Sequence, residues 1–203
     1  MKYRILVSAI AATGALALAT PAAAAGPEMT TPGTTTDVPP TPGVAKGEPG
    51  GAGAASLQNV DTKTYVQKAA MTDLFEVQAG KLALEKSKDK NIRKFAEQMV
   101  TDHTTTTTKL QAALKTGDVD VSPPTKLDAP HAAKLKELTD ASGAEFDRTY
   151  VQMQVAGHQE ALRLHQSYAS SGDNATLKAL AGKTAELVQH HLDEAKALSG
   201  NSG

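Results

Sequence analysis

IRKFAEQMVTDH, at residues 92–103, is the segment that decides the fold of this chain. Its apolar residues recur every three or four positions, as they do on one face of an α-helix; they are Ile92, Phe95, Ala96, Met99 and Val100. His103 continues this face four residues after Met99. The segment therefore predicts an amphipathic helix that buries an ionisable side chain near its middle.

The same periodicity extends along the chain from about residue 61. It predicts four long helices and one short one, over about 62–86, 90–115, 131–140, 142–170 and 175–199. The turns at 87–89 and 171–174 supply candidate N-caps for the helices that follow them, and Gly117 is a C-terminal stop. Ser142 and Glu145 form a capping-box pattern, so Glu145 is interpreted as a cap rather than a ligand.

Two short turns and one long connection join the long helices. The turns lie at about 87–89 and 171–174, whereas 117–141 is a long crossover that contains Pro123, Pro124 and Pro130. This connectivity describes an all-α, ferritin-like four-helix bundle with a long crossover between helices 2 and 3. The sequence contains no strand pattern, and about 140 structured residues suffice for one core.

The N-terminal part of the chain differs from the rest in composition. Residues 1–25 have a basic start, an apolar run and an Ala-x-Ala site, which are the features of a secretory signal peptide. Residues 26–57 are rich in Pro, Gly and Thr and are expected to form a disordered linker, which leaves a helical bundle at 58–199. We expect a periplasmic or secreted protein. It would carry no lipid anchor, because the chain has no cysteine.

Charge and composition exclude two classes of partner. Without Lys2 and Arg4 of the leader, 19 basic residues remain against 22 acidic ones, a formal charge of −3. The charges are interspersed and aromatic residues make up only 3% of the chain, so nucleic acid is not an expected partner. No stretch after the leader is long and apolar enough to span a membrane. The sequence identifies no protein partner.

Each predicted long helix carries one ionisable, metal-capable side chain within its apolar stripe. These residues are Glu76, His103, His158 and His191. Burying several such groups together is costly unless they pair or share a cation, so we expect them to converge. Residue counts from the turn at Asp89 place the first three within one helical turn in depth, and His191 one or two turns higher.

Three aspartates are expected near this cluster. Asp102 lies at the edge of its apolar stripe, and Asp147 lies about two turns nearer the Asp89 end of the bundle, where it could join a site containing His191. We count both as auxiliary ligands. Asp73, one turn from Glu76, is a further candidate.

The donor set favours a transition metal. Three imidazoles with one carboxylate suit Zn, Cu, Fe or Mn, and imidazole-rich sites favour Cu or Zn over Mg or Ca. Met99 and Met153 lie on inner faces, where they would act as soft copper ligands or as simple core residues. No Glu-x-x-His occurs: Glu186 and His190 are one residue too far apart and face outward. Di-iron oxygenase or ferroxidase chemistry is therefore disfavoured.

Two interpretations of the polar cluster remain open. It is either a metal site or a hydrogen-bonded network that specifies the core, whereas His131 and His165 taken alone are interpreted as ordinary residues. Catalysis by a nucleophile has no support, because cysteine is absent and no Gly-x-Ser-x-Gly occurs. The predicted function is an exported metal-binding bundle. The alternative is a non-catalytic cell-envelope or stress-related interaction protein with a structural polar core.

The sequence also resembles the exported bacterial family known as domain of unknown function 4142, which is placed in the ferritin-like superfamily. The resemblance covers roughly 62–198. It is carried by Glu76, by FAEQMVTDH at 95–103, by FDRTY at 146–150 with His158, and by His191-Leu192. It implies a ferritin-like four-helix bundle in the periplasm or outside the cell. It implies no activity.

Overall fold

The computed structural model describes residues 60–200, and these form five α-helices. Their bounds are α1 (Thr62–Lys86), α2 (Lys90–Thr116), α3 (Ala129–Asp140), α4 (Gly143–Ser171) and α5 (Ala175–Gly200). No strand occurs within this range. The predicted signal peptide at 1–25 and the predicted linker at 26–57 lie outside the described residues. The all-α expectation is confirmed.

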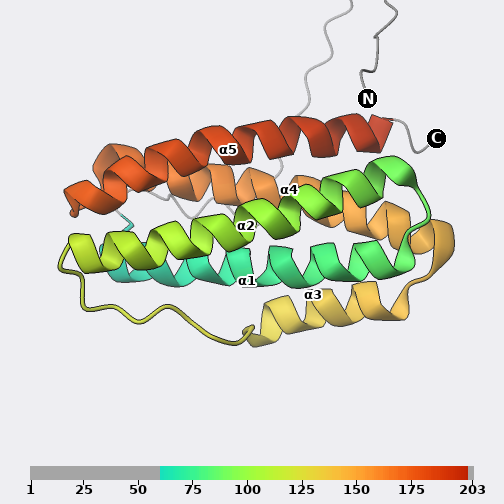
Figure 1. Cartoon of the computed structure of the whole chain (residues 1–203), viewed down its shortest axis with the longest axis horizontal. Helices are drawn as coiled ribbons and strands as arrows, with labels where there is room; N and C mark the ends of the chain where they lie inside the picture. The colour runs from blue at the N-terminus through green and yellow to red at the C-terminus, as the bar shows by residue number, and fades with distance from the viewer. Residues whose placement is uncertain (1–59, 201–203) are drawn as a thin grey trace, which may run out of the picture. The chain divides into compact units, whose positions relative to one another are not determined.

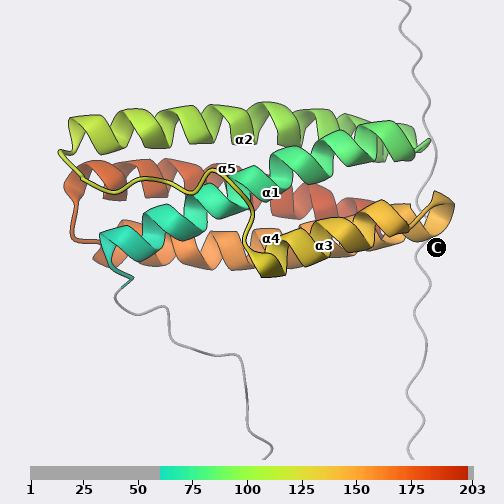
Figure 2. The ribbon, with the colours of Figure 1, turned by 90° about the horizontal axis from the view of Figure 1, so that it is seen from below.

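The four long helices pack as an antiparallel bundle, and α3 lies along its outside (Figure 1). α1 packs against α2 and α4, and α5 packs against α4 and α2. After α2, the chain crosses the length of the bundle through an extended segment and α3 before α4 begins (Figure 2). The long crossover between the second and third long helices is therefore confirmed.

Side-chain caps define most helix starts. Asp89 accepts hydrogen bonds from the backbone N–H groups of Asn91 and Ile92, and Asn174 Oδ1 accepts one from Leu177 at 3.0 Å. Such caps satisfy backbone donors that a helix leaves without partners in its first turn. The N-caps predicted for the two turns are therefore confirmed, and they explain why the turns before α2 and α5 can be short.

The predicted capping box at the start of α4 is wrong. Ser142 occupies the N-cap position, but its side chain makes no capping hydrogen bond within the described chain, and Glu145 is exposed. The cause is Gly143, which adopts a left-handed φ of +55°. A capping box requires a regular first helical turn, and this backbone conformation does not supply one.

The core consists of two apolar clusters at the two ends of the bundle. The cluster near the α1–α2 turn includes Phe75, Phe95, Met99, Phe146 and Tyr150. The other includes Tyr65, Leu110, Leu164, Tyr168 and Leu177. Along each of the four long helices, buried polar residues fall between these clusters in sequence. The bundle therefore has a polar layer at mid-length, closed at both ends by apolar side chains.

Gly80 allows α1 and α2 to approach each other closely. A Cβ atom built on Gly80 would stand 2.8 Å from Val100 Cγ2 and 3.1 Å from the carbonyl oxygen of Ala96. These distances leave no room for a larger residue. Within residues 60–200, no helix combines the length and the apolar character that crossing a membrane requires.

Candidate metal centre

Three imidazoles from three helices meet in the polar layer. His103 of α2, His158 of α4 and His191 of α5 are each 3% exposed or less. Their ring centroids lie 5.4–5.7 Å apart, and one ring nitrogen from each lies within 4.8 Å of the other two. The sequence predicts His191 to lie one or two helical turns higher than His103 and His158, but its ring lies beside theirs. Helix ends are poor reference points here, because α4 begins further out than α5 ends (Figure 1).

Each ring has one nitrogen bound to an acceptor outside the cluster. His103 Nδ1 donates to Asp73 Oδ1 at 2.8 Å, and His158 Nδ1 donates to the backbone carbonyl of Gln154 at 2.9 Å. His191 Nε2 donates to Asp102 Oδ2 at 2.9 Å. These bonds fix the tautomer and orientation of each ring. Metal-ligating histidines in proteins are commonly held in this way.

The second nitrogen of each ring is buried and unsatisfied. His103 Nε2, His158 Nε2 and His191 Nδ1 have no hydrogen-bond partner among the described residues. Buried polar atoms without partners are rare in proteins because losing hydration without replacement is costly. One cation at ~2.0–2.1 Å from each nitrogen would hold the three roughly 3.5 Å apart. The donor set therefore fits a metal after a small contraction of the cluster.

The three rings differ in their affinity for protons. Burial, reinforced by the charge of His103, lowers the pKa of His158 to about 4. Burial also lowers the pKa of His191 to about 4, although the hydrogen bond that its ring donates to Asp102 acts to raise it. For His103, burial favours a lower pKa, but the hydrogen bond to Asp73 and the charges of nearby carboxylates outweigh this effect, so the pKa is raised. Two of the three rings are therefore neutral at pH 7, as metal binding would require, whereas His103 binds a proton more readily than the other two.

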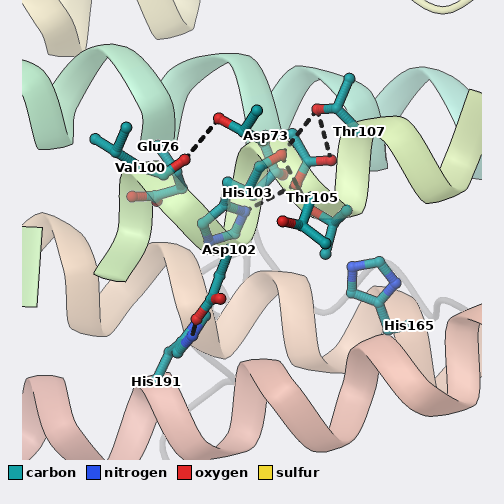
Figure 3. A network of polar contacts seen from close by, with 12 residues as sticks. Asp73, Glu76, Val100, Asp102, His103, Thr105, Thr107, His165 and His191 are labelled. Atoms are coloured by element: carbon teal, nitrogen blue, oxygen red, sulfur yellow. Dashed lines mark hydrogen bonds and ion pairs between the residues drawn. The ribbon is translucent and has the colours of Figure 1, made fainter. Parts of the chain in front are cut away.

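Asp73 is the centre of a polar network around His103 (Figure 3). Besides the imidazole, it accepts hydrogen bonds from Thr106 Oγ1 at 2.8 Å and Thr107 Oγ1 at 3.2 Å. The sequence pattern indicates Asp73 only as a further candidate and does not indicate the threonines. Their positions three and four residues after His103, on the same helix face, are the signal that would have found them.

Glu76 is connected to the histidine cluster through one intervening residue, Gln154. It is 1% exposed, and its Oε2 accepts a hydrogen bond from Gln154 Nε2 at 2.6 Å. The backbone carbonyl of the same glutamine holds His158. Burial raises the pKa of Glu76, and the neighbouring His103 opposes this shift. Glu76 is thus linked to the cluster through Gln154, a residue to which sequence analysis gave no role.

The two predicted auxiliary aspartates differ in position. Asp102 holds His191 Nε2, on the side of the ring away from the cluster, and its side chain is 29% exposed. Asp147 is not part of the histidine group in the described residues. The helical rise of ~1.5 Å per residue separates it from His158 by about 16 Å along α4. The structure therefore places Asp102 as an orienting residue and leaves Asp147 away from the three rings.

The remaining histidines lie outside the cluster. His165 is 6% exposed, its Nδ1 hydrogen-bonds the hydroxyl of Tyr65 at 3.1 Å, and burial lowers its pKa to about 4. On α3, His131 Nδ1 donates to Asp128 Oδ1 at 2.6 Å. His190 is exposed, in agreement with its predicted outward position.

Three solved structures are similar to this chain in fold. The crystal structure of a DUF305 fragment from Deinococcus radiodurans matches with a TM-score of 0.59 at 15% identity, over 68% of this chain and 93% of that one. CopM in its Cu(II)-bound form matches with a TM-score of 0.60 at 14% identity, over 71% and 99%. CopM in its Cu(I)-bound form gives 0.59 at 13%, over 70% and 98%. At these identities the likeness establishes the fold alone.

The sequence itself matches one family model. No curated protein matches the chain. The model of the domain of unknown function DUF4142 matches residues 46–198, a range that contains nearly all of the helical bundle and every residue of the histidine cluster. The chain therefore belongs to the DUF4142 family.

Proposed function

We propose that this protein is an exported helical bundle that binds one transition-metal ion through His103, His158 and His191. Two observations carry the proposal: each of the three rings brings a nitrogen within 4.8 Å of the other two, and each has one buried nitrogen without a hydrogen-bond partner in the described chain. A cation satisfies all three at once. Asp73, Asp102 and Gln154 would orient the ligands. The carboxylate of Glu76, which is linked to the cluster through Gln154, would contribute charge.

A purely structural polar network is less consistent with these contacts. Such a network stabilises a core when every member is satisfied, and a half-satisfied one is worse than an apolar core. Here one nitrogen of each of the three rings is bonded and the other is not, within residues 60–200. The arrangement is the one expected of ligands held ready for an ion.

Copper is the first ion to test. Imidazole ligands suit copper and zinc, and copper also accepts thioether sulfur. Met99 is fully buried on α2, one turn before His103. CopM, which shares the fold, has been solved with Cu(II) and with Cu(I) bound. Zinc, iron and manganese remain the comparison ions.

The location of the protein is part of the proposal. The leader at residues 1–25 supports export to the periplasm or the cell exterior. We expect the mature protein, recovered from the cell envelope or the medium, to begin near residue 26 by mass spectrometry. Recovery of the full-length chain from the cytoplasm alone would contradict export.

Metal content tests the binding proposal directly. The mature protein is expected to hold one copper ion by elemental analysis and to melt at a higher temperature with Cu²⁺ than without it, since a ligand that binds only the folded state stabilises it. His103→Gln and His158→Gln should abolish both effects.

His165→Gln is the matched control, because it removes a buried histidine of α4 outside the cluster. It should keep the metal and the shift. A wild-type protein that binds none of the four metals and melts unchanged would leave the alternative, a non-catalytic envelope or stress-related interaction protein with a structural polar core.

A further inference from the structure

A cavity of about 450 Å³ lies between α1, α4 and the crossover helix α3. Its walls are largely apolar and include Met71 and Phe75 from α1, and Met153 from α4. His131 of α3 lines it at one side, with its Nδ1 bonded to Asp128 and its ring in edge contact with that of Phe75. The volume is typical of cavities that admit a small ligand.

Glu76 forms the inner end of this cavity. Although its side chain is 1% exposed, it belongs to the cavity lining. Gly157 of α4, also in the lining, leaves the space beside it free: a Cβ atom at Gly157 would stand 3.5 Å from Glu76 Oε1. A longer side chain at position 157 would cover that oxygen.

The same carboxylate connects the cavity to the histidine cluster. Its second oxygen, Oε2, is bonded to Gln154 Nε2, and the backbone carbonyl of Gln154 is bonded to His158 Nδ1. Glu76 also interacts electrostatically with His103 and His191. An ion at Glu76 Oε1 is therefore one residue away from a ligand of the candidate metal centre.

We propose that this cavity is the route by which the metal ion reaches the three histidines, with Glu76 as its inner acceptor. This inference rests on the proposed function and adds the path by which the metal ion enters the bundle. The three rings are at most 3% exposed, so an ion needs an opening. The thioethers of Met71 and Met153 and the imidazole of His131 are soft or intermediate donors, which suit copper more than a hard cation. Asp102, 29% exposed and already bonded to His191, also joins the cluster to the surface, on the side of α2 and α5.

The rate of copper uptake tests the route. Cu²⁺ alone is mixed with metal-free mature protein in a stopped-flow instrument, and the absorbance of imidazole-bound copper is followed. Gly157→Leu fills the inner end of the cavity and is expected to slow uptake at least tenfold, while elemental analysis still finds one ion at equilibrium. Gly182→Leu is the matched control. Gly182 is a half-buried helical glycine of α5 whose added Cβ would meet only Ala169 Cβ, at 4.0 Å, so uptake should keep the wild-type rate.

A second pair of variants keeps the test decisive if Gly157→Leu does not fold. Met153→Lys places a positive charge in the half-buried wall and is expected to slow uptake more at low salt than at high salt, because screening weakens the repulsion. Met153→Leu, of similar volume, keeps the wall apolar and should slow uptake much less.

Two results would overturn the route while leaving the proposed function intact. One is wild-type uptake rates in both cavity variants, with one ion bound. The other is slow uptake in Asp102→Asn with a normal rate in Gly157→Leu, which would place the path between α2 and α5. A wild-type protein that takes up no copper would instead contradict the proposed function itself.

Discussion

His103, His158 and His191 are held by three different kinds of acceptor: a buried carboxylate, a backbone carbonyl and a half-buried carboxylate. The backbone acceptor cannot be removed by substitution. Asp73 is the most informative of the others, because it is buried and accepts bonds from His103 and from two threonines. An oriented imidazole binds a metal more tightly than a free one, so the contribution of Asp73 is measurable.

Asp73→Asn is expected to weaken metal affinity by roughly 10- to 100-fold, the usual effect of removing such a supporting partner. The amide keeps the size of the carboxylate but lacks its charge. Affinity is measured by competition with a chelator of known strength. Asp147→Asn is the control, since Asp147 lies outside the histidine group in the described residues. Equal losses in the two variants would contradict the assigned role of Asp73.

Sequence analysis found the three histidines because each interrupts an apolar stripe. It did not distinguish ligands from orienting residues among Asp73, Asp102 and Asp147. That distinction depends on which side of each ring a carboxylate reaches, and residue spacing carries no information about side-chain direction between different helices. Thr106 and Thr107 could not be distinguished from the neighbouring threonines for a related reason. Neighbouring threonines bond their own helix, as Thr104 does to Val100 O at 2.6 Å, so the run looks uniform in sequence.

At the scale of single helices, the ranges could be read from the sequence nearly to the residue. The periodicity is strong, and Asp89, Gly117 and Asn174 mark real ends. The exceptions are at the crossover. α3 begins at Ala129, two residues earlier than expected, because Asp128 caps it and Pro130 is tolerated in a first turn. The missing capping box of α4 depends on the backbone angle of Gly143, which sequence patterns do not specify.

Gly80 provides a test of how α1 and α2 pack. Gly80→Ala is expected to destabilise the bundle by ~1–3 kcal/mol, because the added methyl would overlap Val100 and approach the Ala96 carbonyl. Urea unfolding followed by circular dichroism measures the change.

Gly182→Ala is the matched substitution, because the added methyl would meet only Ala169 Cβ at 4.0 Å, and helix propensity predicts a gain of up to about 1 kcal/mol there. If both variants gain stability, the close contact between α1 and α2 is not as tight as described.

At the scale of the whole molecule, buried histidines couple folding to pH. The pKa values of His158, His165 and His191 are lowered to about 4 in the folded chain, whereas an unfolded histidine titrates near 6.5. Their neutral forms favour folding, and this stability is present above pH 6.5 and lost as pH falls toward 4. The raised pKa values of His103 and Glu76 act in the opposite direction.

The metal-free protein is therefore expected to melt at a lower temperature at pH 5 than at pH 7, because three imidazoles with pKa values near 4 take up protons in the unfolded chain but not in the folded one. Differential scanning calorimetry at several pH values measures the trend. His165→Gln should reduce the dependence of the free energy of unfolding on pH by the contribution of one proton, at most ~1.4 kcal/mol per pH unit. A melting temperature that rises steadily from pH 7 to pH 5 would show that these histidines are charged in the folded chain.

The bundle has its two apolar clusters at opposite ends and its polar residues at mid-length. Each end can therefore hold the four helices in register by itself, and the central layer is relieved of that task. Protein engineers could use this separation of roles. The inward side chains at positions 73, 76, 103, 154, 158 and 191 could be exchanged for other polar residues while the two apolar clusters maintain the fold. New sets of donor atoms at these positions would change the chemistry of the polar layer without a redesign of the rest of the bundle.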